Sequence, residues 1–164
     1  MPYHLGERAS ADLFQLNGSN YLALVDHYSD YIELEPLRNT SSVAVIRAMK
    51  RNFARHGIPD KCVTDNDLQL VNLEYARFAR EYGFTSIKSS SYHSRGNGKA
   101  ESAVKIVKNI LKKSRFEDPY LALLAYRNML QQGYQYSPAQ RLMSRKLRDI
   151  IPTATSQLLP QAAS

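Results

Sequence analysis

The sequence predicts a single α/β domain built on a mixed five-stranded sheet that is flanked by helices. Three extended segments joined by short turns open the chain, at residues 9–16, 20–28 and 31–37, and are typical of an antiparallel meander. Beyond residue 40, helical and extended segments alternate, which favours strands that pair in parallel. With 164 residues, 43% of them apolar, the chain is large enough to bury a core.

Turn residues set the limits of the meander. The first strand meets Asn17-Gly18, the strongest short hairpin signal. A second turn at Ser29-Asp30 leads into the third strand. Pro36 indicates that this third strand lies at an edge of the sheet or ends there, because proline has no N–H to donate to a ladder.

The next three elements alternate between helix and strand. A helix is predicted over residues 41–55, with Val45, Ile46, Met49 and Phe53 inward and Gly57 as its end. A short strand over 61–64 follows and ends at Asp65. A second helix is predicted over 72–82, with these positions inward: Leu73, Ala76, Phe78 and Ala79.

The last part of the chain is predicted to be mostly helical. A strand over 84–88 is followed by helices over 98–114 and 118–132, and Ser137-Pro138 begins a further short helix. We divide the chain into an N-terminal extension (1–8), a core (9–152) and a tail (153–164). The tail has too little periodicity for an element and is expected to be flexible.

Charge and cysteine usage limit the classes of function. The formal net charge of +7 favours a polyanionic partner, with nucleic acid ahead of an acidic surface. Cys62 is the only cysteine, so the sequence offers no internal disulfide and no structural zinc site of the Cys/His type. No apolar run approaches the ~18 residues that span a membrane, and the N-terminus lacks a secretory signal. We expect a soluble, intracellular protein that does not enter membranes.

Three carboxylates stand at informative positions. Asp12 interrupts an apolar strand and Asp65 ends another, so the two meet if those strands are neighbours. Glu101 opens the helix that follows a polar loop. Carboxylates that converge without a basic partner repel one another, and Mg²⁺ or Mn²⁺ is the usual resolution. Two such ions would suit an in-line phosphoryl displacement. The spacing of acids alone is a weak signal.

The helix that begins at Glu101 has two distinct faces. Lys105, Lys108 and Lys112 share one face with Glu101, whereas Ala103, Val107 and their apolar neighbours face the opposite side. The lysine row either lies along a phosphate backbone or is a solvated surface, and its periodicity favours neither.

Four segments together closely resemble the catalytic core of Gypsy-type LTR-retrotransposon integrases, which belong with retroviral integrases. The segments read ADLFQLNGSNYLALVDHYSDY, FARHGIPDKCVTDN, SSYHSRGNGKAESAVKIVK and DPYLALLAYRN with YSPAQRLMSRKLR. The resemblance runs from about residue 9 to 152 in the same motif order. It implies an RNase H-like fold and a D,D-35-E active site made of Asp12, Asp65 and Glu101, with 35 residues between the last two.

The resemblance also implies an activity. Such enzymes remove nucleotides from the 3′ ends of element DNA and then use each 3′-hydroxyl to attack target DNA, with two Mg²⁺ or Mn²⁺ ions at the carboxylates. The implied partners are element ends, target DNA and further copies of the chain, as a dimer or higher oligomer. The implied location is the nucleus, after a possible stage in a cytoplasmic virus-like particle.

Further positions match DNA-contacting residues of the family. Asn66 and Gln69 follow the second aspartate, Tyr92 and Asn97 lie in the polar loop, and the helix contributes a basic row: Lys105, Lys108 and Lys112. The two aspartates and the glutamate would act as metal ligands and catalytic groups. These roles rest on the resemblance.

The chain departs from the family pattern beside these residues. Asp67 and Leu68 replace a glycine and a proline after the second aspartate, and Ser91 and Ser94 replace two prolines of the polar loop. Loss of proline loosens a loop. An active divergent enzyme therefore stands beside two alternatives: an impaired or host-adopted derivative that binds DNA or serves as a scaffold, and a related RNase H-like nuclease or transposase.

Overall fold

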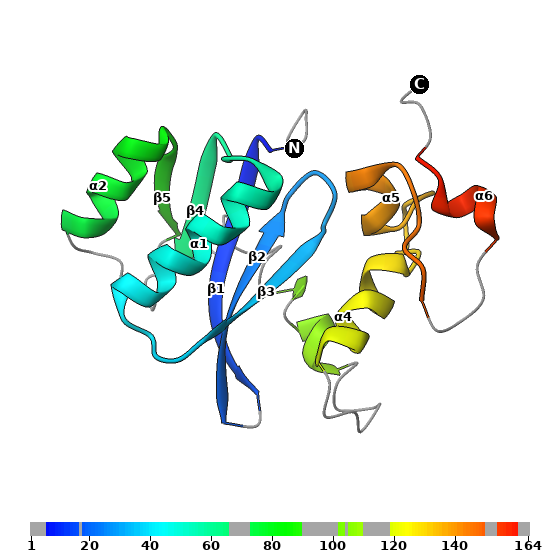
Figure 1. Cartoon of the computed structure of the whole chain (residues 1–164), viewed down its shortest axis with the longest axis horizontal. Coiled ribbons are helices and arrows are strands. Elements are labelled where there is room, and N and C mark those ends of the chain that lie inside the picture. Colours follow the sequence, from blue (N-terminus) through cyan, green and yellow to red (C-terminus); the bar gives the residue numbers. More distant parts are fainter. Residues whose placement is uncertain are drawn as a thin grey trace.

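The sheet is mixed and five-stranded, as predicted. The computed structural model describes residues 6–16, 18–65, 73–89, 102–103, 105–109, 119–149 and 154–160. The sheet has the order β3-β2-β1-β4-β5 (Figure 1), formed by β1 (Arg8–Leu16), β2 (Ser19–Asp26), β3 (Ile32–Leu37), β4 (Lys61–Asp65) and β5 (Thr85–Ser89). The β1–β2 and β2–β3 pairs are antiparallel, whereas the β1–β4 and β4–β5 pairs are parallel.

The helices lie between and after the parallel strands. They are α1 (Ser42–His56), α2 (Leu73–Tyr82), α4 (Pro119–Asn128), α5 (Pro138–Met143) and α6 (Thr155–Leu158). Residues 102–103 and 105–109 are also helical, and we call them the lysine helix. The sequence predicts no counterpart of α6. No helix within the described ranges is long and apolar enough to cross a membrane.

Turn geometry confirms the predicted meander. Leu16 pairs with Ser19, so only two residues connect β1 to β2, and Gly18 has a φ of 79°. A positive φ is strained for most side chains, so glycine suits this position. Pro36 lies in β3, at the edge of the sheet, where the absent N–H disrupts no inner ladder.

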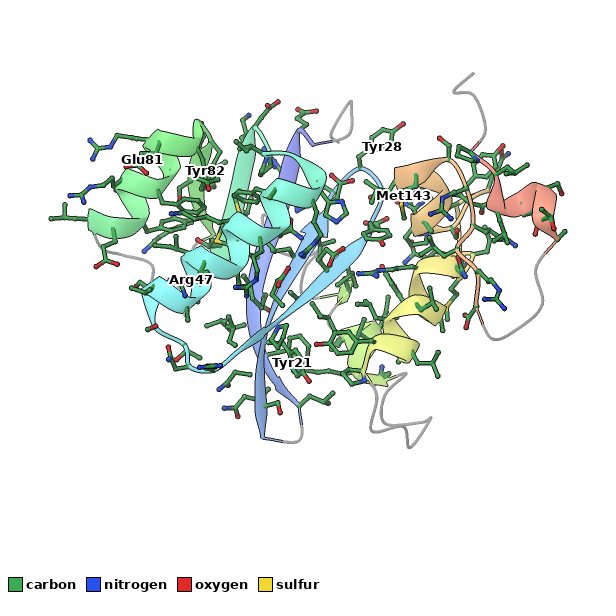
Figure 2. The ribbon with its side chains drawn as sticks, in the orientation of Figure 1. Tyr21, Tyr28, Arg47, Glu81, Tyr82 and Met143 are labelled. Atoms are coloured by element: carbon green, nitrogen blue, oxygen red, sulfur yellow. The ribbon has the colours of Figure 1, made fainter. Side chains whose placement is uncertain are left out.

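Helices α1 and α2 cover one face of the sheet (Figure 1). The predicted inward residues of α1 are all buried. In α2 the prediction was wrong for Leu73, which is 82% exposed, and for Ala76, which is also exposed. The buried stripe begins at Tyr75 instead, and its aromatic rings pack against Phe53 of α1 and against Phe84, the residue before β5. Ring packing therefore decided the inward face of α2. Tyr82 lies on this side of α2, next to α1 (Figure 2).

The lysine helix and α4 supply the core on the opposite face. Ala103 and Val107 are buried there, as predicted, with Ala122, Leu123 and Tyr126 of α4 and with β-strand residues that include Phe14. The two apolar layers enclose the sheet from both sides. This arrangement explains why the inner strands are mostly apolar.

Helix α4 ends four residues before its predicted end at position 132. The side chain of Asn128 donates a hydrogen bond to the carbonyl oxygen of Leu147 at 2.8 Å and accepts one from its N–H at 2.9 Å. These two bonds tie the helix end to a distant segment. Ser137 then caps α5 through a reciprocal pair of hydrogen bonds with Gln140, which confirms the predicted short helix.

One arginine fastens α4 to the edge strand. Arg127 donates to the carbonyl oxygen of Ile32, at 3.0 Å from Nε and 2.7 Å from Nη2, and its guanidinium lies 4.4 Å from the centre of the Tyr31 ring. Arg127 also approaches Glu33 of β3 at 3.3 Å. A planar guanidinium suits this combination of contacts, which a lysine could not reproduce.

A second arginine fastens α5 to the β2–β3 turn. Arg141 pairs with Asp30 at 2.8 Å, donates to Gln131 at 2.5 Å and to the carbonyl oxygen of Tyr136 at 3.2 Å. The ring of Tyr134 lies 3.9 Å from its guanidinium carbon. Since only 10% of the Arg141 side chain is exposed, these contacts are poorly screened by water.

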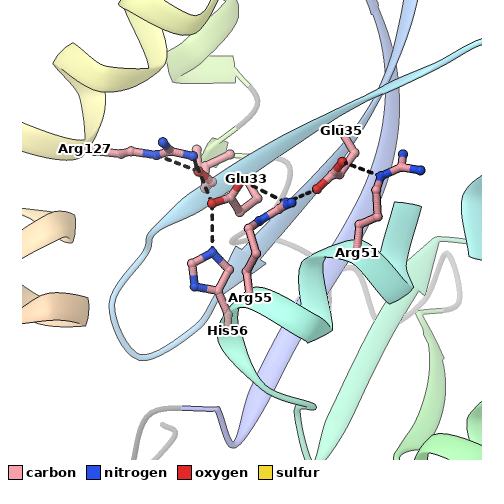
Figure 3. A network of polar contacts seen from close by, with 7 residues as sticks. Glu33, Glu35, Arg51, Arg55, His56 and Arg127 are labelled. Carbon is pink, nitrogen blue, oxygen red and sulfur yellow. Dashed lines mark hydrogen bonds and ion pairs between the residues drawn. The ribbon is translucent and has the colours of Figure 1, made fainter. Parts of the chain in front are cut away.

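Salt bridges join β3 to α1 (Figure 3). Glu33 contacts His56 at 2.9 Å and Arg55 at 3.5 Å, and Glu35 contacts Arg55 and also Arg51 at 3.5 Å. Burial alone would raise the pKa of Glu33, but the hydrogen bond with His56 and the nearby arginines hold that pKa below its usual value. The network keeps the edge strand against the helix.

Cys62 lies in the core beneath α1 and α2 and is completely buried. Burial raises the pKa of its thiol to about 12. The thiolate is therefore absent at neutral pH, which makes Cys62 a packing residue and excludes it as a nucleophile.

We predict that Arg141→Lys lowers the free energy of unfolding by about 1–3 kcal/mol, because lysine cannot contact Asp30, Gln131 and Tyr136 together. Arg145→Lys is the matched control, since the one hydrogen bond that Arg145 makes to a described residue is long, to the carbonyl oxygen of Lys146 at 3.3 Å. Urea unfolding of both variants tests this. Equal losses in the two variants would contradict the assignment of Arg141 as the fastener.

We also predict that Cys62 does not react with an aromatic disulfide reagent at pH 8 while the chain is folded. The high pKa leaves no thiolate, and burial blocks access. The thiol should react once denaturant unfolds the chain. Absorbance of the released thiolate follows the reaction, and rapid labelling of the native protein would show that this core opens locally.

Candidate active site

The pairing of β1 with β4 brings two predicted site positions together. The parallel register matches Ser10 with Val63 and Ala11 with Thr64. The next residue on each strand is Asp12 and Asp65, respectively. Adjacent strands lie about 4.8 Å apart, so the two backbone positions are close neighbours. The prediction that the first and fourth strands are neighbours is confirmed.

Asp12 lies on the face of the sheet that the lysine helix covers. Residues alternate between the two faces of β1: Ala11 belongs to the core beneath α1 and α2, whereas Phe14 belongs to the core beneath the lysine helix and α4. Asp12 shares the face of Phe14 and is half-buried. Its backbone is held on both sides, because it pairs with Ala23 of β2 and follows the residue that pairs with β4.

The lysine helix crosses this same face next to Asp12. The ammonium nitrogen of Lys108 lies 5.3 Å from the centre of the Phe14 ring, and Phe14 stacks on Tyr21 with 5.4 Å between ring centres. Ala103 and Val107 pack into the core below. The helix that directly follows Glu101 in the sequence is therefore anchored two residues from Asp12 along β1.

Of the other predicted site residues, some are described by the structure and others lie outside the described residues. Lys105 is exposed on the lysine helix, and Lys108 is half-buried over Phe14, so the row is not uniformly solvated. Asp65 has a described backbone at the end of β4. The remaining predicted site residues lie outside the described residues: Asn66, Gln69, Tyr92, Asn97, Glu101 and Lys112.

Phe14 is a site residue that the sequence analysis missed. Its ring is 6% exposed and carries the ammonium of Lys108. A cation over an aromatic face is attracted by the negative charge above the ring. The alternation of β1 held the signal, because Asp12 and Phe14 are two residues apart and so share a face.

One polar pair near Asp12 offers an alternative chemistry, which the structure excludes. The hydroxyl of Ser10 lies 2.5 Å from Nε2 of His27, an arrangement that could suggest a nucleophile with its base. Ser10 is completely buried and His27 is 7% exposed, so no substrate reaches them. The pair joins β1 to the residue that directly follows β2.

Carboxylate oxygen is the ligand that Mg²⁺ and Mn²⁺ prefer, so Asp12 and Asp65 on adjacent strands fit such an ion. Within the part of the chain that the structure describes, no three His, Cys, Asp or Glu side chains cluster closely enough to hold a metal. The third predicted ligand, Glu101, lies outside that part.

Comparison with protein families finds an integrase core domain over residues 3–94. The matched residues include Asp12 and Asp65 and end before Glu101. An uncharacterized protein of Caenorhabditis elegans is 31% identical over 152 residues, which cover 88% of this chain. The matched region spans only 12% of the length of that protein. These matches confirm the family that the sequence motifs predicted.

Solved integrase structures share the fold. The catalytic core domain of HTLV-2 integrase in complex with magnesium has a TM-score of 0.67 at 18% identity, over 84% of this chain and 96% of that one. The catalytic core of BIV integrase has a TM-score of 0.69 at 17% identity, over 84% and 93% of the two chains. A chain of the simian T-cell lymphotropic virus intasome has a TM-score of 0.73 at 20% identity, over 97% and 60%. The predicted RNase H-like fold is confirmed.

Proposed function

This chain belongs to the integrase core domain family, and on that premise we propose that it is a DNA-joining catalytic core with Asp12, Asp65 and Glu101 as its active site. The proposed reactions are removal of nucleotides from the 3′ ends of element DNA and transfer of each new 3′ end into target DNA. The observation that carries the proposal is the β1–β4 register, which makes Asp12 and Asp65 neighbours.

The three carboxylates would hold Mg²⁺ or Mn²⁺, in a two-ion arrangement. Once bound, such ions stabilise charge on the attacking and leaving oxygens of a phosphoryl transfer. The fit rests on oxygen donors at adjacent strand positions 12 and 65. The HTLV-2 integrase core was solved in complex with magnesium, which supports the choice of ion.

The chain's own residues position the DNA in this proposal. In each step an oxygen nucleophile, water or a 3′-hydroxyl, forms a bond to phosphorus while the opposite P–O bond breaks and the leaving oxygen gains a proton. Lys105 and Lys108 would neutralise backbone phosphates along the exposed side of the lysine helix. The ring of Phe14 limits the rotamers of Lys108, so its ammonium is oriented before DNA arrives.

The loop residues would contact the DNA end. By the family resemblance, Tyr92 would stack on an unpaired base, and Asn66, Gln69, Asn97 and Lys112 would contact the nucleic acid near the carboxylates. The departures Asp67, Leu68, Ser91 and Ser94 fall in the same two segments of the sequence. A derivative that binds DNA without cleaving it is therefore the second candidate, and the loop substitutions are the observation that favours it.

We propose that the chain works as a homo-oligomer in the nucleus, where target DNA is found. Dimeric and trimeric forms of the HTLV-2 core and the intasome of simian T-cell lymphotropic virus support assembly of this fold into oligomers. A preference for cutting RNA–DNA hybrids over DNA ends would instead support an RNase H-like nuclease.

We predict that Asp12→Asn and Asp65→Asn each lower Mn²⁺-dependent nicking or rejoining of branched DNA about a hundredfold or more, because each removes a charged metal ligand. Calorimetric titration with Mn²⁺ should show weaker binding in both variants. Thermal unfolding without metal should be unchanged or shifted upward, since one negative charge is removed.

Asp60→Asn is the matched control, because Asp60 lies before β4 at the opposite end of the strand from Asp65. It should keep both Mn²⁺ binding and nicking. An active chain whose activity survives Asp12→Asn and Glu101→Gln would refute the assigned site. A chain that binds DNA but nicks nothing with Mn²⁺ would support the non-cleaving derivative.

We predict that Lys108→Glu weakens binding of duplex DNA and makes the affinity less dependent on salt, because one phosphate contact is lost and a repulsion is introduced. The slope of log affinity against log salt should fall by about 1. Lys61→Glu has the same charge change at the far end of β4 and is the control. Equal salt slopes for the two variants would indicate that the lysine row is a solvated surface that does not contact DNA.

A further inference from the structure

A cavity of about 490 Å³ lies where β3 ends and α1 begins. Its walls come from the end of β3, the connecting residues and the first turns of α1. Three arginines line it: Arg38 in the connection, and Arg47 and Arg51 on α1. Among the residues that the structure describes, no aspartate or glutamate lines the cavity. The cavity is therefore strongly positive.

Within the described ranges, two of the three arginines have no partner and can bind a ligand. Arg38 and Arg47 are exposed, and neither makes a hydrogen bond or ion pair with any residue that the structure describes. Arg51 is 47% exposed and lies 3.5 Å from Glu35, which leaves part of its guanidinium open.

The positive charge continues along α1. This helix carries four lysine or arginine residues and no acid. Arg47, labelled in Figure 2, also borders a neighbouring groove of about 260 Å³ between α1 and α2, which Lys50 and Arg77 line together with Glu74 and Glu81. The acids of α2 weaken the charge on that side. The unopposed charge is thus concentrated around Arg38 and Arg47.

The cavity lies at the same end of the sheet as Asp65. Strands β1, β3 and β4 run in the same direction, because β1 and β3 are both antiparallel to β2 and β4 is parallel to β1. The carboxyl ends of β3 and β4 therefore lie at the same end of the sheet. Three strand spacings, or about 14 Å, separate them. Helix α1 covers the face opposite Asp12, so the cavity is separate from the candidate active site.

We propose that the Arg38–Arg47–Arg51 cavity is a second binding site for DNA, which holds the phosphate backbone of a duplex that does not occupy the carboxylate site. Guanidinium groups bind phosphate oxygens in a bidentate manner, and three of them around one hollow suit two or three successive phosphates. Contacts to phosphate carry no sequence information, so we expect binding to depend little on the base sequence.

The choice of DNA as the polyanion rests on the proposed function, whereas the charge and openness of the cavity do not. A joining enzyme must handle two DNA segments, and the carboxylates can act on only one phosphodiester at a time. A basic cavity at the same end of the sheet, on the other face, can retain the second segment. Its role is positioning.

The test uses the full chain and a fluorescent 30-base-pair duplex, with affinity measured by anisotropy between about 50 and 200 mM salt. The double variant Arg38→Gln/Arg47→Gln is compared with Lys61→Gln/Arg80→Gln, which removes two positive charges from exposed positions away from the cavity. Circular dichroism and thermal unfolding confirm that both variants fold. These substitutions are at the surface, so their folds should match that of the parent.

We expect Arg38→Gln/Arg47→Gln to bind about tenfold more weakly at the lower salt and to reduce the salt slope by about 2. The control should change affinity less than about threefold, through net charge alone. Equal losses in the two double variants, or no loss in the cavity variant, would overturn the proposal. Loss of binding to vesicles of anionic lipid without loss of binding to DNA would overturn it as well.

Two further measurements separate this proposal from the proposed function. The loss caused by Arg38→Gln/Arg47→Gln should be the same with Mn²⁺ and with a chelator, because the cavity does not use the carboxylates. One outcome is that the parent never cleaves or joins DNA while the cavity variant binds DNA more weakly than the parent does. In that outcome the joining function fails and the second site stands. If the parent joins DNA and the cavity variant binds and joins equally well, the second site fails alone.

Discussion

The parallel pairing of β1 with β4 is the constraint on which the candidate site depends. Asp12 and Asp65 are more than fifty residues apart in the sequence, and only this ladder makes them neighbours. A shift of the register by one residue would turn Asp12 away from the level of Asp65 and would also exchange the two faces of β1. The apolar residues Ala11 and Phe14 belong to different cores, so such a shift would place Asp12 in the core beneath α1 and α2 and would move Phe14 away from the lysine helix. Packing on both faces therefore fixes the register that the chemistry needs.

The second half of the chain reaches the site through a different kind of contact. The lysine helix packs Ala103 and Val107 into the core, and the ammonium of Lys108 lies over the ring of Phe14. Behind it, α4 is held by Arg127 to the backbone of β3, and α5 is held by Arg141 to the β2–β3 turn. Buried ionic contacts are costly unless well satisfied, and both guanidiniums are satisfied several times. The meander thus acts as the frame to which the later helices are attached.

The sequence was sufficient for most of the fold, because periodicity and turn residues mark the elements. Three features were predicted correctly: the hairpin at Gly18, the edge strand with Pro36 and the adjacency of the first and fourth strands. The inward face of α2 was not, since Leu73 is exposed and ring packing selected Tyr75. The early end of α4 depends on a long-range pair of hydrogen bonds, which no local pattern contains. At the candidate site, the alternation of side chains along β1 indicates which face Asp12 shares. It does not indicate that Lys108 lies over the ring of Phe14. The roles of the loop residues stay predictions.

The edge strand has a consequence for how copies of this chain can associate. A free sheet edge invites another strand to add to it, but Pro36 cannot donate a hydrogen bond there, and Glu33 and Glu35 place two charges along the same short strand. Continuation of the sheet into a neighbouring copy at β3 is therefore disfavoured. An assembly that involves this side of the molecule would have to use helical surfaces instead, and its geometry would then be independent of backbone pairing.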